Sequence, residues 1–327
     1  MAEGRVFWRM PGETEPQTLV ASTESEDAFH FAPFEDAPAL TLKGRAEACD
    51  WPVAGPVVHA DSAPVIEADE VAYRAMIEGA LAAIQAEGLQ KVVVSRQSLE
   101  AHVLSPEDVF RAKSEQFPHA FVYLWSHPRS GTWVGATPEL LVAPGARPGE
   151  FQTMSLAGTR RLDLPTAWSD KERAEQEWVT AYIRERVAES GTQLGEDGPA
   201  DLSYGNIAHL CTRLTFTSDL DMVALARRFH PTPAVAGVPL NQALKFIAMH
   251  EPAPREFYSG WLGPQVADRP EASGAFVNLR CTHWTAGGVV AFAGAGIVAG
   301  SDPGLEWMET EAKLDSIRTS LAPTDKL

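Results

Sequence analysis

The sequence predicts an α+β fold with antiparallel strands, and three observations support this class. Apolar runs of strand length occur in pairs around turn residues: residues 121–125 and 132–136 flank a turn at 127–131, and residues 275–284 and 289–293 flank Gly287-Gly288. Helical segments stand between groups of strands rather than after each strand, which favours α+β over a doubly wound parallel sheet. With 327 residues, 45% of them hydrophobic, the chain can build a large core.

Helices are expected wherever periodicity and capping signals coincide. Residues 69–87 place Tyr73, Ile77 and Ile84 on one face. Serine before proline, and serine three residues before glutamate, are typical N-cap patterns. We therefore expect helices at residues 69–87 and 240–250, and after Ser105-Pro106, Ser169-Asp170-Lys171-Glu172 and Ser301-Asp302-Pro303.

The remaining strands are predicted from short apolar runs. Besides the two hairpins, we expect strands at residues 91–96, 151–156, 207–210 and 213–217. Residues 1–65 carry short apolar pieces broken by proline and acidic residues. They predict short strands and loops that belong to the same unit as residues 66–327.

The formal net charge of −17 excludes functions that need a basic surface. Such a surface repels nucleic-acid phosphates and anionic lipids, so we expect neither as a partner. A small anionic substrate would need a local cationic site. No signal peptide, no run of about 18 apolar residues and no paired cysteines are found. We expect a cytoplasmic protein with reduced thiols, and a monomer because no amphipathic surface stripe stands out.

Two pairs of glutamates have the spacing of a shared helix face. Glu172 and Glu175 are three residues apart on one expected helix, and Glu306 and Glu309 on another. If these faces meet, up to four carboxylates converge, and such a cluster needs a cation; hard oxygen ligands suit Mg²⁺. On spacing alone, two solvated helix faces are the better interpretation. Lys313 follows Glu309 by four residues, an ordinary helix pair.

Several other segments each permit a structural and a functional interpretation. Gly294-Ala295-Gly296 after a strand resembles the dinucleotide fingerprint, but no second parallel strand can follow, so a tight turn whose amides approach an anion is the better interpretation. Arg280 is expected in the middle of a strand, where it needs a carboxylate partner from the protein or a ligand. His230, Glu139 and residues 155–160 are individually explained by local structure.

In chain order, these segments resemble the chorismate-binding enzymes, which include isochorismate, salicylate, anthranilate and aminodeoxychorismate synthases. The matching segments run from about residue 69 to about residue 320: KVVVSR, FVYLWSHPRSGTWVGATPELLV, SLAGTRR, DKERAEQEWV, HLCTRLTF, HPTPAVAGVP, REFYSGWLGP, FVNLRC and GAGIVAGSDPGLEWMETEAK. The resemblance implies two antiparallel sheets packed as a sandwich, with helices outside and the active site in a cleft. Residues 66–327 would then form the catalytic domain.

Lys91 separates the members of this family. In isochorismate and salicylate synthases a lysine at this place is the general base, and anthranilate synthases lack it. Aminodeoxychorismate synthases usually carry a nucleophilic lysine where this chain has Ala157. The resemblance therefore implies an isochorismate synthase of the compact, menaquinone-associated type, with salicylate synthase as the alternative, and a nicotinamide-dependent oxidoreductase or a non-catalytic relative as distant ones. Two departures are Gln176, where relatives have histidine, and Trp261-Leu262.

The resemblance also implies a role for each candidate residue in converting chorismate to isochorismate. Lys91 would activate water for attack at C2, and Glu139 would protonate the hydroxyl that leaves C4. Mg²⁺ would bind Glu175 and Glu309, with Glu172 and Glu306 nearby or acting through water. The substrate would contact Ser155, Leu156, Gly158, Thr159, His230, Arg280, the amides of Gly294 and Gly296, and Lys313.

Overall fold

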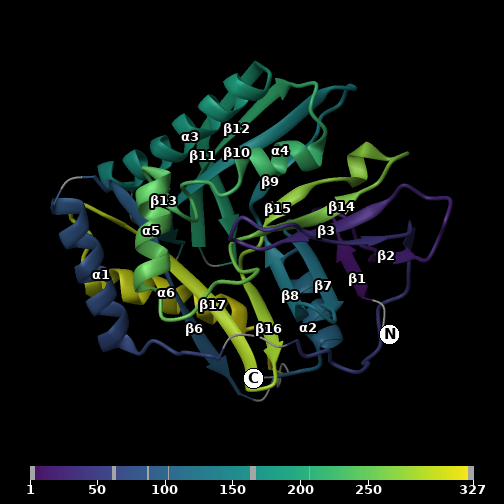
Figure 1. Cartoon of the computed structure of the whole chain (residues 1–327), viewed down its shortest axis with the longest axis horizontal. Coiled ribbons are helices and arrows are strands. Elements are labelled where there is room, and N and C mark those ends of the chain that lie inside the picture. The colour runs from purple at the N-terminus through teal and green to yellow at the C-terminus, as the bar shows by residue number, and fades with distance from the viewer. Residues whose placement is uncertain are drawn as a thin grey trace.

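The computed structural model describes residues 4–60, 64–86, 88–101, 103–162, 167–205 and 207–322. It contains two large sheets whose strand pairs are all antiparallel (Figure 1). The chain therefore has the predicted α+β sandwich with helices on the outside. Within the described residues, no helix is sufficiently long and apolar to span a membrane.

The nine-stranded sheet has the order β13-β6-β17-β16-β8-β7-β1-β2-β5. Its strands are β1 (Arg5–Arg9), β2 (Gln17–Val20), β5 (Arg45–Ala48), β6 (Lys91–Glu100), β7 (Phe121–His127), β8 (Gly131–Thr137), β13 (Gly237–Val238), β16 (Cys281–Thr285) and β17 (Gly288–Val298).

The eight-stranded sheet has the order β11-β12-β10-β9-β15-β14-β3-β4. Its strands are β3 (Ala28–Ala32), β4 (Leu40–Lys43), β9 (Leu140–Pro144), β10 (Glu150–Arg161), β11 (Thr192–Tyr204), β12 (Ile207–Thr217), β14 (Trp261–Gln265) and β15 (Ala275–Val277). The first 48 residues thus supply strands to both sheets.

Six α-helices cover the sheets: α1 (Glu70–Gln85), α2 (Pro106–Gln116), α3 (Asp170–Ser190), α4 (Met222–Phe229), α5 (Leu240–His250) and α6 (Pro303–Arg318). A 3₁₀ turn spans Pro270–Ala272. In Figure 1, α3 lies along β10, β11 and β12, whereas α1 and α6 lie at the β6–β17 end of the molecule. Helices α2, α3 and α6 begin at the predicted N-caps Ser105, Ser169 and Asp302, respectively. Ser169 forms the complete capping box.

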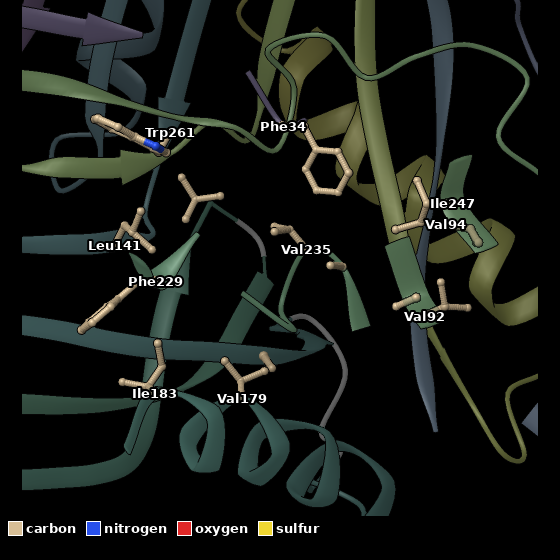
Figure 2. Packing of buried hydrophobic residues seen from close by; sticks show 14 of the residues in the cluster. Phe34, Val92, Val94, Leu141, Val179, Ile183, Phe229, Val235, Ile247 and Trp261 are labelled. Atoms are coloured by element: carbon tan, nitrogen blue, oxygen red, sulfur yellow. The ribbon is translucent and has the colours of Figure 1, made fainter. Parts of the chain in front are cut away.

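Aromatic and aliphatic side chains fill the space between the sheets. Phe31 of the eight-stranded sheet lies 5.3 Å from Trp125 and 5.9 Å from Trp133 of the other sheet, measured between ring centroids. Figure 2 shows a second part of the core, where Val92 of β6 lies beside α5, and Val179 of α3 packs from the other side. Both clusters hold the two sheets face to face, so that the ends of β6, β10 and β17 meet.

Two predictions about the C-terminal strands were wrong: one placed a single strand at residues 275–284, and the other placed a turn at Gly294-Ala295-Gly296. The segment 275–284 is two strands: β15 belongs to one sheet and β16 to the other, and residues 278–280 carry the chain between them. Arg280 therefore lies in this crossing with φ 53°, not in mid-strand. The other error concerns Gly294 and Gly296, which lie inside β17 and pair with Ser95 and Val93 of β6, so they form no turn.

Candidate active site

Ten of the predicted site residues line one cavity of about 90 Å³ between the two sheets. They are Glu139, Leu156, Gly158, Thr159, Glu175, Arg280, Gly294, Gly296, Glu309 and Lys313. These side chains come from β10, β17, α3, α6 and two connecting segments, which are distant in sequence. The fold brings them together where the antiparallel β6–β17 pair faces β10.

Lys91 and Glu175 form an ion pair beside this cavity. Lys91 is the first residue of β6 and is only 1% exposed, and its Nζ lies 2.8 Å from Oε1 of Glu175 on α3. Gly296 of β17 lies directly beside this ion pair. A Cβ at Gly296 would overlap Oε1 of Glu175 and come within 3.1 Å of Cε of Lys91. A side chain at this position would therefore force the Glu175 carboxylate, and with it the ion pair, to shift.

Glu139 supplies a buried carboxyl group. It follows β8, precedes β9 and is 4% exposed. Burial raises the pKa of Glu139 to about 7, although Lys91, Arg280 and Lys313 act in the opposite direction. A carboxyl with this pKa is partly protonated near neutral pH and can give a proton to a leaving group.

The last helix presents two glutamates, each held by a lysine. Glu309 Oε1 lies 2.7 Å from Lys313 Nζ, which also donates a 2.7 Å hydrogen bond to the carbonyl of Gly294. Burial acts to raise the pKa of Glu309, but Lys313 outweighs it and holds the pKa below its usual range. Glu306, 2.6 Å from Lys171, has a raised pKa because it is buried and lies near Glu309.

Three of the four predicted carboxylates face a common region. Burial acts to lower the pKa of Lys171, but Glu306, with smaller contributions from Glu175 and Glu309, raises it. Glu172, expected nearby or acting through water, caps α3 in this structure: its Oε2 accepts a 2.7 Å hydrogen bond from the backbone N–H of Ser169. Over the described residues, no three acidic, histidine or cysteine side chains form a ready-made metal cage.

Arg280 is a buried cation that faces the cavity without a carboxylate partner among the described residues. Its Nη2 lies 3.3 Å from Nε2 of His209, and its guanidinium lies 5.4 Å from the ring centroid of Tyr204. Nδ1 of His209 lies 2.7 Å from the carbonyl of Gly158, which assigns the ring proton to Nδ1 and leaves Nε2 to accept from Arg280. Burial, assisted by Arg280, lowers the pKa of His209 to about 3, so this ring is neutral.

His209 is the site residue that the sequence did not single out. It lies on β12, within a segment already matched to the family, but a single histidine among apolar strand residues carries no pattern of its own. Its place opposite Arg280 depends on the β10–β12 pairing, which only the folded chain reveals.

Ser155 faces away from the cavity, so its predicted contact with substrate is corrected. Its Oγ lies 2.7 Å from Oγ1 of Thr180 and accepts a 3.1 Å hydrogen bond from Nε2 of Gln176. Strand alternation explains the error, because Leu156 and Gly158 face the cavity while Ser155 points beneath α3. Gln176 also donates to Thr212 at 2.7 Å, so it ties α3 to the sheet.

His230 is the other residue that the structure places elsewhere. Its Nε2 lies 3.2 Å from the carbonyl of Phe34, and it lines a separate cavity of about 960 Å³ that also includes Trp261. This larger cavity contains no lysine, and its Glu251 is paired with Arg255 at 2.6 Å. The smaller cavity holds the paired amine and carboxyl groups, so we assign the site to it despite its size.

Known proteins share sequence and fold with this chain. A family model described as chorismate binding enzyme matches residues 54–322. The isochorismate synthase MenF of Escherichia coli (strain K12) is 31% identical over 268 residues, which cover 77% of this chain and 61% of MenF. Anthranilate synthase component 1 1 of Halobacterium salinarum is 31% identical over 280 residues, which cover 79% of this chain and 51% of the relative. The matched regions thus span about half to three-fifths of these relatives.

Two solved structures share the fold. The menaquinone-specific isochorismate synthase MenF from Escherichia coli aligns with a TM-score of 0.79 and 22% identity, covering 98% of this chain and 89% of that one. A structure titled as 2,3-dihydroxybenzoate-specific isochorismate synthase, DhbC from Bacillus anthracis, aligns with a TM-score of 0.80 and 21% identity, covering 97% and 96%. At these identities the likeness concerns the fold.

Proposed function

Since this chain belongs to the chorismate-binding enzyme family, we propose that it is an isochorismate synthase, which converts chorismate to isochorismate. The observation that carries the proposal is the convergence of two proton-transfer groups on one cavity: the amine of Lys91 and the carboxyl of Glu139. The isomerisation requires a base for the water that attacks C2 and an acid for the hydroxyl that leaves C4.

In the proposed mechanism Lys91 and Glu139 act in opposite directions. Lys91 acts as the base and takes a proton from the attacking water, and its ion pair with Glu175, 2.8 Å from its Nζ, holds the amine beside the cavity. Protonated Glu139 gives its proton to the departing hydroxyl, which its raised pKa of about 7 allows near neutral pH. As C2 gains the new oxygen and C4 loses its hydroxyl, the two conjugated ring double bonds each shift by one position, and no covalent intermediate is needed.

Cationic side chains provide the anion site that an acidic protein needs for chorismate. Arg280 lacks a carboxylate partner within the described structure and would pair with the enolpyruvyl carboxylate. The amides of Gly294 and Gly296 stay candidates for the same carboxylate, because the residues opposite them in β6, Ser95 and Val93, direct their own N–H groups to Glu251 and Ala236 and not to β17. In addition, Gly296 leaves space for Lys91, and the carbonyl of Gly294 holds Lys313.

We further propose that the enzyme uses Mg²⁺, held by Glu175 and Glu309 with Glu306 close by. The donor set fits, because carboxylate oxygens suit this hard cation and the buried Glu306 and Glu309 disfavour each other's charge. Each carboxylate is held by a lysine in this structure, so the cation would replace lysine contacts. When bound, Mg²⁺ would neutralise the glutamates and hold the ring carboxylate of the substrate.

Three alternatives differ in their supporting observations. Salicylate synthase activity would use the same residues and add elimination of pyruvate. Anthranilate synthases also occur among the relatives, but the presence of Lys91 favours water over ammonia as the nucleophile. A nicotinamide site has no structural basis, since Gly294-Ala295-Gly296 lies within an antiparallel strand and not at a strand–helix turn. A menaquinone role rests on the likeness to MenF.

Product analysis tests the proposal. Purified protein is incubated with chorismate and Mg²⁺, with and without ammonium, and the products are separated by HPLC. A mixture of chorismate and isochorismate that reaches the same ratio from either side is expected. Salicylate with pyruvate would assign the lyase-competent branch, ammonium-dependent anthranilate would overturn the choice of nucleophile, and no conversion would contradict the proposed activity.

A further inference from the structure

A second buried lysine, Lys113, lies outside the set of residues used above. It is on α2, which packs against β7 and β8, and its side chain is 0% exposed. Within the described residues, its Nζ has no hydrogen-bond partner and forms no ion pair with a carboxylate. An ammonium group in such a place is costly, because burial removes its hydration without a replacement partner.

Arg280 is linked to the helix of Lys113 through two stacked rings: its guanidinium lies 5.4 Å from the ring centroid of Tyr204, which stacks at 4.4 Å on Phe117, the C-cap of α2. Cys281 also lies close, but burial raises the pKa of this thiol to about 12, so it carries no charge near neutral pH. Nη1 of Arg280 is buried and unpartnered as well. Lys113 and Arg280 are therefore two buried cation-bearing side chains, each with an unpartnered donor; Glu309 and Glu139 act electrostatically on Arg280, but neither forms an ion pair with it among the described residues.

The other ionisable groups around α2 do not supply a counter-charge. Glu107, on the same helix, is paired with Arg5 at 2.5 Å. Tyr123 on β7 and Tyr204, which stacks on Phe117 with ring centroids 4.4 Å apart, are buried phenols whose pKa values are raised by burial. Both phenols are neutral in the physiological range. Of the two groups that act electrostatically on Lys113, Cys281 and Arg280, only Arg280 is charged near neutral pH.

We propose that Lys113 is an electrostatic partner of Arg280 that takes up a proton when a ligand carboxylate binds Arg280. The proposal rests on the proposed function only in assigning a carboxylate to Arg280. In the free protein, burial, assisted by Arg280, lowers the pKa of Lys113 to about 7. A carboxylate at Arg280 offsets the guanidinium charge and attracts the ammonium form, so ligand and proton bind cooperatively.

The direction of the pH dependence follows from this linkage. Below about pH 7 Lys113 is already protonated, and a carboxylate ligand binds with its full affinity. As the pH rises above 7, binding requires proton uptake, so the affinity falls. Once the amine is neutral in both the free and the bound protein, the affinity reaches a lower constant value. This lysine would therefore tune ligand affinity to pH without touching the ligand.

Calorimetric titration at constant Mg²⁺ tests the proposal. The probe is 3-(carboxymethoxy)benzoate, a dicarboxylate without an enol ether to react, measured in buffers of different ionisation enthalpy. We expect uptake of a fraction of a proton at pH 7.5 and none at pH 5. All proteins compared also carry Glu139→Gln, because that carboxyl acts on Arg280 and has a pKa of about 7 as well. In this background Lys113→Met should abolish the uptake, and its affinity should be about tenfold weaker than that of the parent protein at pH 6 but equal at pH 9.5, since one pKa unit corresponds to tenfold in affinity.

Two variants separate electrostatics from packing. Lys113→Arg cannot lose its charge, so it should bind the probe at pH 9.5 as tightly as at pH 6, without proton uptake. Lys245→Met, at an exposed position on α5, should match the parent protein. Binding without proton uptake, or uptake that Lys113→Met retains, would overturn the role of Lys113 and leave the proposed function intact. A wild-type protein that neither binds the dicarboxylate nor converts chorismate would contradict both.

Discussion

Lys91 Nζ and Glu175 Oε1 lie 2.8 Å apart, although the two residues come from different elements, β6 and α3. The pair is possible because β17 passes beside it with glycine at position 296, where a Cβ would overlap the carboxylate. Three segments thus define one amine–carboxylate pair at the edge of the cavity. The packing of β6, α3 and β17 therefore sets the position of the proposed base, Lys91.

Replacement of the proposed base should abolish turnover without unfolding the protein. We expect Lys91→Ala to lower kcat by roughly 10²–10⁴-fold, which is the usual contribution of one proton-transfer group. Glu175→Gln should also reduce turnover, since it removes the partner of Lys91. Initial rates with chorismate, together with circular dichroism spectra, measure both effects. A Lys91→Ala variant with a near-normal rate would remove Lys91 as the base.

Substitution of Gly296 should damage the site through sterics alone. Gly296→Ala inserts a methyl group into the space of the Lys91–Glu175 pair, so we expect a large loss of turnover with a modest loss of stability. Gly79→Ala is the matched control, because its Cβ would meet only Phe246 at 4.0 Å and it lies in α1. The control should stabilise the protein by about 0.5–1 kcal/mol and leave activity unchanged. Equal activity in both variants would contradict the steric argument.

The sequence predicted the parts of the fold that have local signals. Ser105 and Ser169 mark helix starts because a capping side chain bonds the first free N–H groups, whatever the tertiary structure. β11 (Thr192–Tyr204) was missed because it is an exposed edge strand of polar residues and shows no apolar alternation. Its pairing with β12, not its composition, makes it a strand.

Some of the predicted site residues have other positions in the fold than expected, and these errors have a common cause. Glu172 and Glu175 share a spacing, but only the packing of α3 decides which of them turns inward; Glu172 caps the helix instead. Gly294 resembled a loop glycine because a strand interior rarely requires one, and the requirement comes from neighbouring strands and side chains. Residues that act through long-range contacts carry no local pattern.

Activity and stability should both depend on the protonation of Glu139. Its pKa is raised from 4.5 to about 7 by burial, so its contribution to stability is complete below about pH 4.5 and is lost as the pH rises to about 7. We expect wild type to lose up to about 3 kcal/mol relative to Glu139→Gln between pH 4.5 and pH 8. Urea unfolding at both pH values measures this difference. The kcat/KM of wild type should fall above pH 7. A stability difference between wild type and Glu139→Gln that does not change with pH would contradict a buried neutral carboxyl at position 139.

Removal of Mg²⁺ should stop the reaction reversibly. Excess EDTA is expected to abolish turnover, and added Mg²⁺ should restore it. Glu309→Gln should weaken Mg²⁺ binding at least tenfold, measured by Mg²⁺-dependent thermal shift, since it removes a proposed ligand. Glu172→Gln is the control: it weakens the α3 cap by about 1 kcal/mol or less and should keep Mg²⁺ affinity. Full activity in EDTA would refute the metal requirement.

Substitution of His209 should weaken substrate binding, whereas substitution of His230 should not. His209 Nε2 lies 3.3 Å from Arg280 at the cavity, whereas His230 contacts the carbonyl of Phe34 in another cavity. His209→Ala removes the acceptor that orients the guanidinium, so we expect KM for chorismate to rise about tenfold or more, a cost typical of one hydrogen bond to a charged group. His230→Ala should keep KM within about twofold while lowering the melting temperature, because it empties a packed position beside Phe34. Steady-state kinetics over a range of chorismate concentrations, with thermal melts of both variants, make the comparison. A large rise in KM for His230→Ala, with His209→Ala unaffected, would mean that the substrate is bound through the larger cavity.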